Sequence, residues 1–190
     1  MRCLLIATMA LVLSGDKLVA ADTLKVGDKA PQFSSMDDGG KTWKSEDHIG
    51  KKIVVIYFYP ADFTGGCTKQ ACAFRDDYAT IQKKNVEVIG VSGDNVQGHT
   101  LFKAYHKLPF SLLADEDGSV AKKFGVPAGK GGTSTAIDAD GKKVAITQGV
   151  RIQRWTFVID QAGKIVHIDK KVNAAADSKK IQEVVEKLSK

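Results

Sequence analysis

The feature of this sequence that most restricts its fold is a run of seven consecutive apolar or aromatic residues, Ile53 to Tyr59. The run is rich in β-branched residues, which favour strands. Because no polar residues alternate with the apolar ones, we expect a strand that is buried on both faces. Such a strand belongs at the centre of a sheet.

The segments after this strand predict alternating helices and strands. No Pro or Gly occurs from Cys67 to Lys84, and apolar residues recur there at spacings of three and four, so this segment predicts an amphipathic helix. Further along we expect a strand, a helix, a short strand and a short helix at Val86–Val91, Gln97–Lys107, Phe110–Leu113 and Ser119–Phe124. This order implies parallel strands joined by a crossover.

The later part of the chain predicts two hairpins and a closing helix. Their strands are expected at Thr133–Ile137 with Lys143–Thr147 and at Arg154–Asp160 with Lys164–Asp169, after a glycine-rich link at Gly129–Gly132. The last helix is expected from about Ala174 to Lys190. We therefore predict a thioredoxin-like α/β fold with a central mixed β-sheet flanked by helices.

The first 21 residues differ from a globular pattern and predict a secretory signal peptide. A basic start, an apolar stretch from Cys3 to Leu13 and the small residues Ala20 and Ala21 follow in the order that such peptides require. The apolar stretch is too short to span a bilayer comfortably. We expect residues 1–21 to be cleaved off, leaving residues 22–190 as one exported domain, periplasmic or otherwise extracytoplasmic, without stable membrane association.

Net charge gives little functional information. The formal charge of +6 is a mild excess, and the lysines are scattered or paired rather than arranged in a stripe with aromatic residues. We therefore do not expect nucleic-acid binding. Solubility accounts for the charge.

Two cysteines, Cys67 and Cys72, remain after the predicted cleavage. A strand, a glycine-rich turn and a cysteine at the start of a helix place a thiol where backbone N–H groups and the helix dipole favour its thiolate. In an exported protein a structural disulfide is the alternative. A bridge closing so short a loop would restrain little unfolded-state entropy, which argues against it.

The spacing Pro-x-x-x-Thr-x-x-Cys, formed by Pro60, Thr64 and Cys67, resembles the active-site motif of peroxiredoxins of the AhpC/TSA type. The later run from Arg154 to Asp160 extends the resemblance, which covers about residues 24–190. Cys72, five residues after Cys67, points to the subgroup of peroxiredoxin Q and bacterioferritin comigratory proteins. The resemblance implies a thiol peroxidase that acts on hydrogen peroxide and organic hydroperoxides.

The resemblance also assigns roles to residues. Cys67 is implied as the peroxidatic cysteine, and Arg154 as the arginine that stabilises its thiolate and the developing oxyanion. Thr64 is implied to hydrogen-bond the sulfur or a peroxide oxygen, and Pro60 to roof the pocket without an N–H of its own. Arg75 and Arg151 compete with Arg154, and we assign Arg75 a supporting role, paired with Asp76 or Asp77.

Cys72 is implied as the resolving cysteine, which turns the Cys67 sulfenic acid into a disulfide. In an intact helix, residues five apart have Cα atoms roughly 8.6 Å apart. That exceeds the reach of a disulfide, about 7 Å. We therefore predict that the first turns of this helix unwind in each catalytic cycle; the alternative is that Cys72 is only an apolar core residue.

One residue departs from the family pattern. Gly65 stands where these peroxiredoxins usually have proline, two residues before the active cysteine. Two successive glycines increase the entropy that the loop loses on folding. The departure predicts either lower reactivity or easier loop opening than is usual in the family.

The partners implied are a peroxide and a thioredoxin-like or glutaredoxin-like reductant, with no cofactor and no metal. The four histidines are not paired with either cysteine by spacing, so a Cys/His metal site is not expected. An intramolecular disulfide needs no second subunit, so a monomer is expected. Two alternatives remain, a thiol–disulfide oxidoreductase, whose Cys-x-x-Cys spacing is missing, and a non-catalytic thioredoxin-fold binding module.

Overall fold

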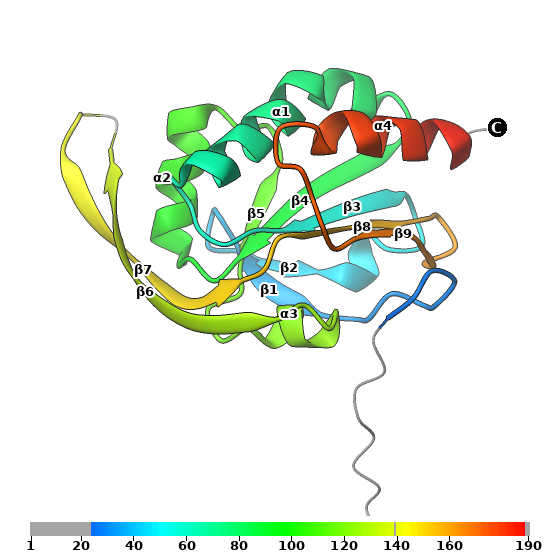
Figure 1. The fold of residues 1–190 in the computed structure, drawn as a ribbon, viewed down its shortest axis with the longest axis horizontal. Coiled ribbons are helices and arrows are strands. Elements are labelled where there is room, and N and C mark those ends of the chain that lie inside the picture. Colours follow the sequence, from blue (N-terminus) through cyan, green and yellow to red (C-terminus); the bar gives the residue numbers. More distant parts are fainter. Residues whose placement is uncertain (1–23, 139, 189–190) are drawn as a thin grey trace, which may run out of the picture.

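Residues 24–138 and 140–188 are described in the computed structural model of the protein. The predicted signal peptide, residues 1–21, lies outside these residues. A mixed seven-stranded sheet with the strand order β2-β1-β5-β4-β3-β8-β9 forms the middle of the molecule (Figure 1). Its strands are β1 (Ser34–Asp37), β2 (Thr42–Lys44), β3 (Ile53–Phe58), β4 (Val86–Ser92), β5 (Ser111–Ala114), β8 (Trp155–Ile159) and β9 (Ile165–Asp169).

The apolar run at Ile53 forms an inner strand, as predicted. All six residues of β3 are buried. The strand pairs in parallel with β4 and antiparallel with β8. The crossover between β3 and β4 is the helix α1, which spans Gly65–Gln82. The predicted thioredoxin-like α/β architecture is therefore confirmed.

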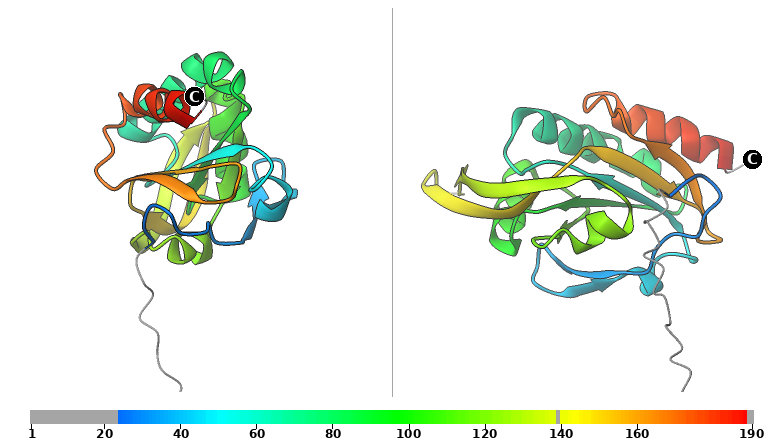
Figure 2. Two further views of the ribbon diagram at one scale, coloured as in Figure 1. Left: turned by 90° about the vertical axis from the view of Figure 1, so that its right-hand side faces the viewer. Right: turned by 60° about the horizontal axis from the view of Figure 1, so that its bottom comes forward.

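Helices cover both faces of the sheet. Alternate residues of β3, Val55 and Tyr57, pack in one cluster with residues of α1, α2 (Val96–His106) and α4 (Asp177–Leu188). Val54 and Ile56 face the opposite cluster, which contains α3 (Ser119–Lys123). Figure 1 and the turned views of Figure 2 show α1, α2 and α4 together on one side of the sheet and α3 on the other. Among the described residues, no helix is long and apolar enough to cross a membrane.

The first predicted hairpin of the later part is longer than expected. Strands β6 (Ala128–Ile137) and β7 (Lys143–Ile152) form a two-stranded arm that extends beyond the main sheet (Figures 1 and 2). The prediction of a glycine-rich link at Gly129–Gly132 was wrong, because these residues lie within β6. Their backbone groups pair with β7, and this pairing outweighs the low strand propensity of glycine.

Three glycines lie where backbones come unusually close around this arm. A Cβ at Gly131 would stand 2.0 Å from the carbonyl oxygen of Gln148. A Cβ at Gly93 would stand 1.9 Å from the carbonyl oxygen of Val150, and one at Gly149 would stand 2.1 Å from that of Glu116. Glycine is therefore required at all three positions for β7 to lie against β6 and against the loops after β4 and β5.

Candidate active site

Cys67 lies in the first turn of α1, directly after the loop that follows β3. The helix begins at Gly65, two residues before the predicted start, with Thr64 as its N-cap. The sulfur therefore lies near the positive end of the helix dipole. The side chain is only 1% exposed, and both Cys67 and Cys72 are free thiols.

Arg154, which the family resemblance implied as the arginine of the site, contacts the sulfur of Cys67. Trp155 pairs with Phe58 at the end of β3, so the residue just before β8 stands beside the loop that carries Cys67. The Nη2 group of Arg154 donates to Sγ of Cys67 at 3.1 Å. This contact places a positive charge directly against the sulfur.

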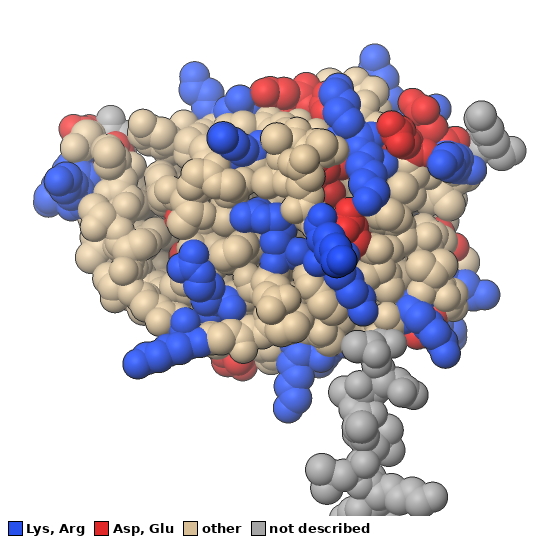
Figure 3. Space-filling model, viewed as in Figure 1, with Lys and Arg blue, Asp and Glu red and all other residues tan. Residues whose placement is uncertain are grey.

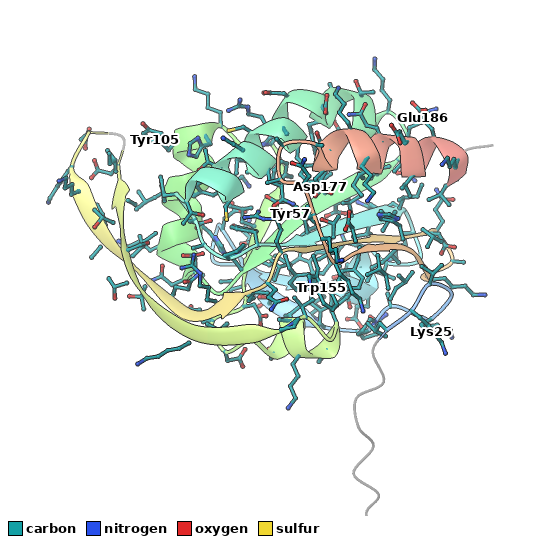
Figure 4. All side chains as sticks on the ribbon, viewed as in Figure 1. Lys25, Tyr57, Tyr105, Trp155, Asp177 and Glu186 are labelled. Carbon is teal, nitrogen blue, oxygen red and sulfur yellow. The ribbon has the colours of Figure 1, made fainter. Side chains whose placement is uncertain are left out.

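Two residues that sequence reasoning missed hold Arg154 in place. Nη1 of Arg154 donates to Oε1 of Gln70, which is completely buried. Gln70 donates in turn to Asp177 at 2.7 Å, and Thr156 donates to the same carboxylate oxygen at 2.8 Å. Burial raises the pKa of Asp177 above its usual value, while these hydrogen bonds oppose the rise. The chain of contacts joins α1, β8 and the start of α4, where Figure 4 labels Asp177.

Pro60 and Thr64 shape the loop above β3. The carbonyl oxygen of Pro60 accepts a hydrogen bond from the side-chain amide of Gln148 on β7. The hydroxyl of Thr64 donates to the carbonyl oxygen of Ala61 at 2.9 Å. Because a hydroxyl has one proton, Thr64 is left as an acceptor toward a bound molecule.

A buried polar cluster holds the loop between β3 and α1 in place. His99 and Asp62 form an ion pair with Nδ1 and Oδ2 2.8 Å apart, and both side chains have no exposed surface. Tyr59 donates its hydroxyl proton to Asp62 at 2.7 Å, and the backbone N–H of Asp62 donates to Asp94. The loop also contains Phe63, whose backbone has a positive φ of 56°. No periodic pattern along the chain indicated this cluster, because its members come from separate elements.

The charges in this cluster shift two pKa values. Burial lowers the pKa of His99, but the Asp62 carboxylate outweighs burial, so the pKa is raised. Burial and the charge of Asp62 raise the pKa of Asp94 to about 6. His99 therefore favours its charged form beside Asp62.

Cys72 lies half-buried on α1, where that helix meets the end of α2. Its sulfur is 3.8 Å from Nδ1 of His106, the last residue of α2. Arg75, one turn after Cys72, donates to the carbonyl oxygen of His106 at 2.8 Å and pairs with Asp76, one of its two predicted partners. Spacing in the sequence did not pair any histidine with a cysteine, but helix packing brings these two residues together.

A hollow of about 660 Å³ opens beside Arg154. Its wall includes Pro60 and apolar residues of β7 and of the loop after β9, and none of its lining residues is acidic. The basic residues that line it are Lys130, Arg151, Arg154, Lys170 and Lys171. Figure 3 shows basic side chains gathered over the middle of this face. The hollow therefore offers a positively charged approach to the guanidinium that contacts Cys67.

Metal chemistry has no support from side-chain clusters in the part of the chain that the structure describes. No group of three or more His, Cys, Asp or Glu residues there is placed to hold a metal ion. The structure itself shows a buried thiol in contact with a guanidinium, and a second thiol further along the same helix.

Sequence comparison places these residues within a known family. Residues 26–168 match the AhpC/TSA family. The chain is 41% identical over 150 residues to a putative peroxiredoxin bcp of Coxiella burnetii, a match that covers 79% of this chain and 91% of that protein. It is 40% identical over 155 residues to a chloroplastic peroxiredoxin Q of Oryza sativa subsp. japonica, covering 82% of this chain. The chain spans 63% of the length of that rice relative.

Comparison of structures agrees with the sequence matches. The fold is similar to the crystal structure of the peroxidoxin BcpB from Mycobacterium tuberculosis, with a TM-score of 0.71 and 28% sequence identity. That match covers 87% of this chain and 98% of the Mycobacterium chain.

Proposed function

The chain belongs to the AhpC/TSA family of peroxiredoxins, and from this premise we propose that it is a thiol peroxidase with Cys67 as its peroxidatic residue. The observation that carries the proposal is the 3.1 Å contact between Arg154 and the Cys67 sulfur at the start of α1. The thiolate attacks one peroxide oxygen, the O–O bond breaks, and the other oxygen leaves as hydroxide or alkoxide. Cys67 becomes a sulfenic acid.

Arg154 and Thr64 are the groups that act on the peroxide in this proposal. The guanidinium stabilises negative charge, first on the sulfur and then on the leaving oxygen. Thr64, whose own proton is directed to Ala61, accepts a hydrogen bond from the hydroperoxide O–H. These two contacts orient the O–O bond toward the sulfur.

Organic hydroperoxides as well as hydrogen peroxide are the proposed substrates. The hollow beside Arg154 is lined in part by Pro60, Pro127, Ile152 and Val172, so it combines apolar surface with positive charge. An organic group attached to the peroxide would occupy this hollow while its O–O bond lies at Arg154.

Cys72 is the proposed resolving cysteine. Its thiol attacks the Cys67 sulfenic acid, forms an intramolecular disulfide and releases water. A thioredoxin-like or glutaredoxin-like protein then reduces this disulfide. Because α1 is continuous from Gly65 to Gln82 while both thiols are free, closing the disulfide requires the first turns of α1 to unwind.

Unwinding of α1 on oxidation is a testable consequence. We expect the backbone amides of residues 67–75 to exchange with solvent markedly faster in the oxidised protein than in the reduced one, as measured by hydrogen–deuterium exchange with mass spectrometry. The buried contacts of Gln70 break in the process. The Cys72→Ser protein serves as control, because its α1 has no reason to unwind; exchange independent of redox state in the wild type would rule the step out.

Gly65→Pro is expected to preserve activity and to stabilise the protein by about 0.4–1 kcal/mol. Gly65 is the first residue of α1, where proline is favoured, and a Cβ there would meet no atom within 4 Å. Thr64 already has the extended backbone, with φ −87° and ψ 145°, that a residue before proline adopts. Thermal unfolding and peroxide consumption measure the two effects.

The neighbouring glycine is the matched control. A Cβ at Gly66 would lie 3.3 Å from Nη2 of Arg154, so Gly66→Ala should displace the guanidinium and slow the reaction with peroxide. Complete loss of activity in Gly65→Pro would show that this loop follows another path during catalysis.

A peroxide titration of the reduced protein, residues 22–190, tests the proposed function. We expect one peroxide to be consumed per two thiols lost, with Cys67 linked to Cys72 in the peptide map. Cys67→Ser should leave peroxide and the Cys72 thiol unchanged, whereas Cys72→Ser should still consume peroxide once and accumulate the sulfenic acid. Peroxide consumption by Cys67→Ser at the wild-type rate would exclude the proposal.

The compartment and the assembly state are part of the same proposal. The basic, apolar and small-residue regions of residues 1–21 support export and cleavage of a signal peptide. A disulfide within one helix completes the reaction cycle without a second subunit, which supports a monomer. Comparison of the mature N-terminus in secreted and cellular fractions, together with light scattering of the purified protein, tests both points.

A further inference from the structure

The side chains around Cys72 form a second small site, separate from the hollow at Arg154. The Cys72 sulfur and Nδ1 of His106 are 3.8 Å apart, within hydrogen-bonding range for sulfur. His106 is half-buried, and its ring packs edge-on against Phe102 and Tyr105, with centroids 4.8 and 4.9 Å away. Phe63, from the active-site loop, lies on the same ring at 6.0 Å. The imidazole is therefore held in one position against the thiol.

The charges that face His106 favour a neutral imidazole. Burial and the guanidinium of Arg75 lower the pKa of His106, while the carboxylate of Asp62 opposes them. The other titratable groups placed against it are the Cys72 thiol and the hydroxyl of Tyr105. A neutral imidazole can accept a proton, and its position at the C-terminal end of α2 stabilises the cation that results.

We propose that His106 is the general base of the resolving step, an inference that rests on the proposed function. His106 takes the proton from the Cys72 thiol, and the thiolate forms a bond with the Cys67 sulfur. The S–O bond of the sulfenic acid breaks, and its oxygen leaves as hydroxide that gains a proton to become water. The Cys72 sulfur is oxidised and the Cys67 sulfur is reduced to the disulfide level, so no further reactant is needed.

Arg75 keeps Cys72 beside His106 while the first turns of α1 unwind. Its bond to the carbonyl oxygen of His106 ties the part of α1 that follows Cys72 to the end of α2. The turns before Cys72 contain the glycines Gly65 and Gly66 and are the part free to unwind. Cys67 therefore moves toward a Cys72 that stays beside His106. The pKa of the Arg75 guanidinium is raised mainly by Asp76 and also by Cys72.

The test measures the reaction of Cys67 with peroxide and the formation of the disulfide separately in two variants. His106→Phe keeps a ring among the aromatic neighbours, and His106→Gln keeps a polar group. We expect the reaction of Cys67 with peroxide to be unchanged and disulfide formation at neutral pH to slow about tenfold or more in both. A cyclic 1,3-dione traps the longer-lived sulfenic acid for mass spectrometry. His167→Gln, on β9, is the matched control and should behave as the wild type.

The pH profile distinguishes a base from a packing residue. The difference between wild type and His106→Phe should be largest near neutral pH and should shrink at alkaline pH, where thiols ionise without a base. Equal slowing at every pH would assign His106 a structural role and overturn the proposal. So would disulfide formation at the wild-type rate in both variants.

A second measurement does not depend on peroxidase activity. In the Cys67→Ser background, alkylation of Cys72 by iodoacetamide near neutral pH should slow once His106 is replaced by Phe, because the thiol loses the base that accepts its proton, and the pH profile of alkylation should shift accordingly. An unchanged alkylation profile would overturn the proposed role of His106, whatever the peroxide does. Failure of wild-type Cys67 to react with peroxide, with the shifted profile retained, would instead overturn the proposed function and leave the Cys72–His106 pair established.

Discussion

Replacement of Arg154 by methionine is expected to slow the reaction of Cys67 with peroxide by about 10²–10³-fold, equivalent to about 2.7–4 kcal/mol of transition-state stabilisation. The reason is the 3.1 Å contact of its guanidinium with the sulfur of Cys67, whose side chain is almost completely buried. Methionine retains most of the side-chain volume without the charge. Single-turnover kinetics, followed through the fluorescence of the neighbouring Trp155, measure the effect.

Three further variants provide reference rates for the reaction with peroxide. Cys67→Ser gives the rate without a reactive thiol. Arg151→Met removes an exposed arginine from the same hollow and should have little effect on the reaction with hydrogen peroxide. Arg154→Lys should recover only part of the rate, because an ammonium lacks the planar pair of donors that reach Cys67 and Gln70 together. A wild-type rate in Arg154→Met would remove Arg154 from the mechanism.

The second large effect is on stability. Asp62→Asn is expected to lower the free energy of unfolding by roughly 3–5 kcal/mol at neutral pH, because it leaves His99 buried without the carboxylate that raises its pKa. The Asp62–His99 pair is completely buried, and Asp62 also accepts the proton of Tyr59. Chemical denaturation of the reduced protein measures the loss.

A partly exposed pair of the same chemistry provides the control. His48 and Glu87 are 2.7 Å apart, with 23% and 18% of their side-chain surfaces exposed. Glu87→Gln should therefore cost no more than about 1 kcal/mol. Equal losses in the two variants would show that burial does not decide the strength of the pair.

The pH dependence of the Asp62 variant follows from the raised pKa of His99. A histidine with a raised pKa contributes stability that is fully present below its unfolded pKa, about 6.5, and is lost as the pH rises through the folded value. The cost of Asp62→Asn should accordingly shrink at alkaline pH. The same titration in the Glu87 variant shows whether the change is specific to His99.

Much of the fold was predictable because its signals are local. The apolar run at Ile53 predicted the buried strand, and the regular apolar spacing after Cys67 predicted α1 to within two residues at each end. The assignment of Arg154 came from the family resemblance, and the structure shows that the strand it precedes pairs with the strand before the cysteine loop. The glycine-rich part of β6 was missed because strand pairing there depends on β7 rather than on the residues themselves.

The residues that support the site were not predictable in the same way. Gln70 shares a helical face with Cys67, but its partner Asp177 arrives with α4, 107 residues later in the chain. His106 reaches Cys72 because α2 ends beside α1, and the spacing of 34 residues carries no signal of that contact. Packing between separate helices decides both pairs.

The close backbone contacts at Gly93, Gly131 and Gly149 bear on how this sequence can diverge. An added methyl group at any of the three positions would meet a carbonyl oxygen at about 2 Å, whatever the state of the thiols. A descendant that lost Cys67 and took up a different role would still have to keep these glycines, whereas it could freely replace Thr64 or Arg154. In lineages that have lost the reaction, the three glycines would therefore stay invariant for steric reasons, while the residues kept for chemistry would vary.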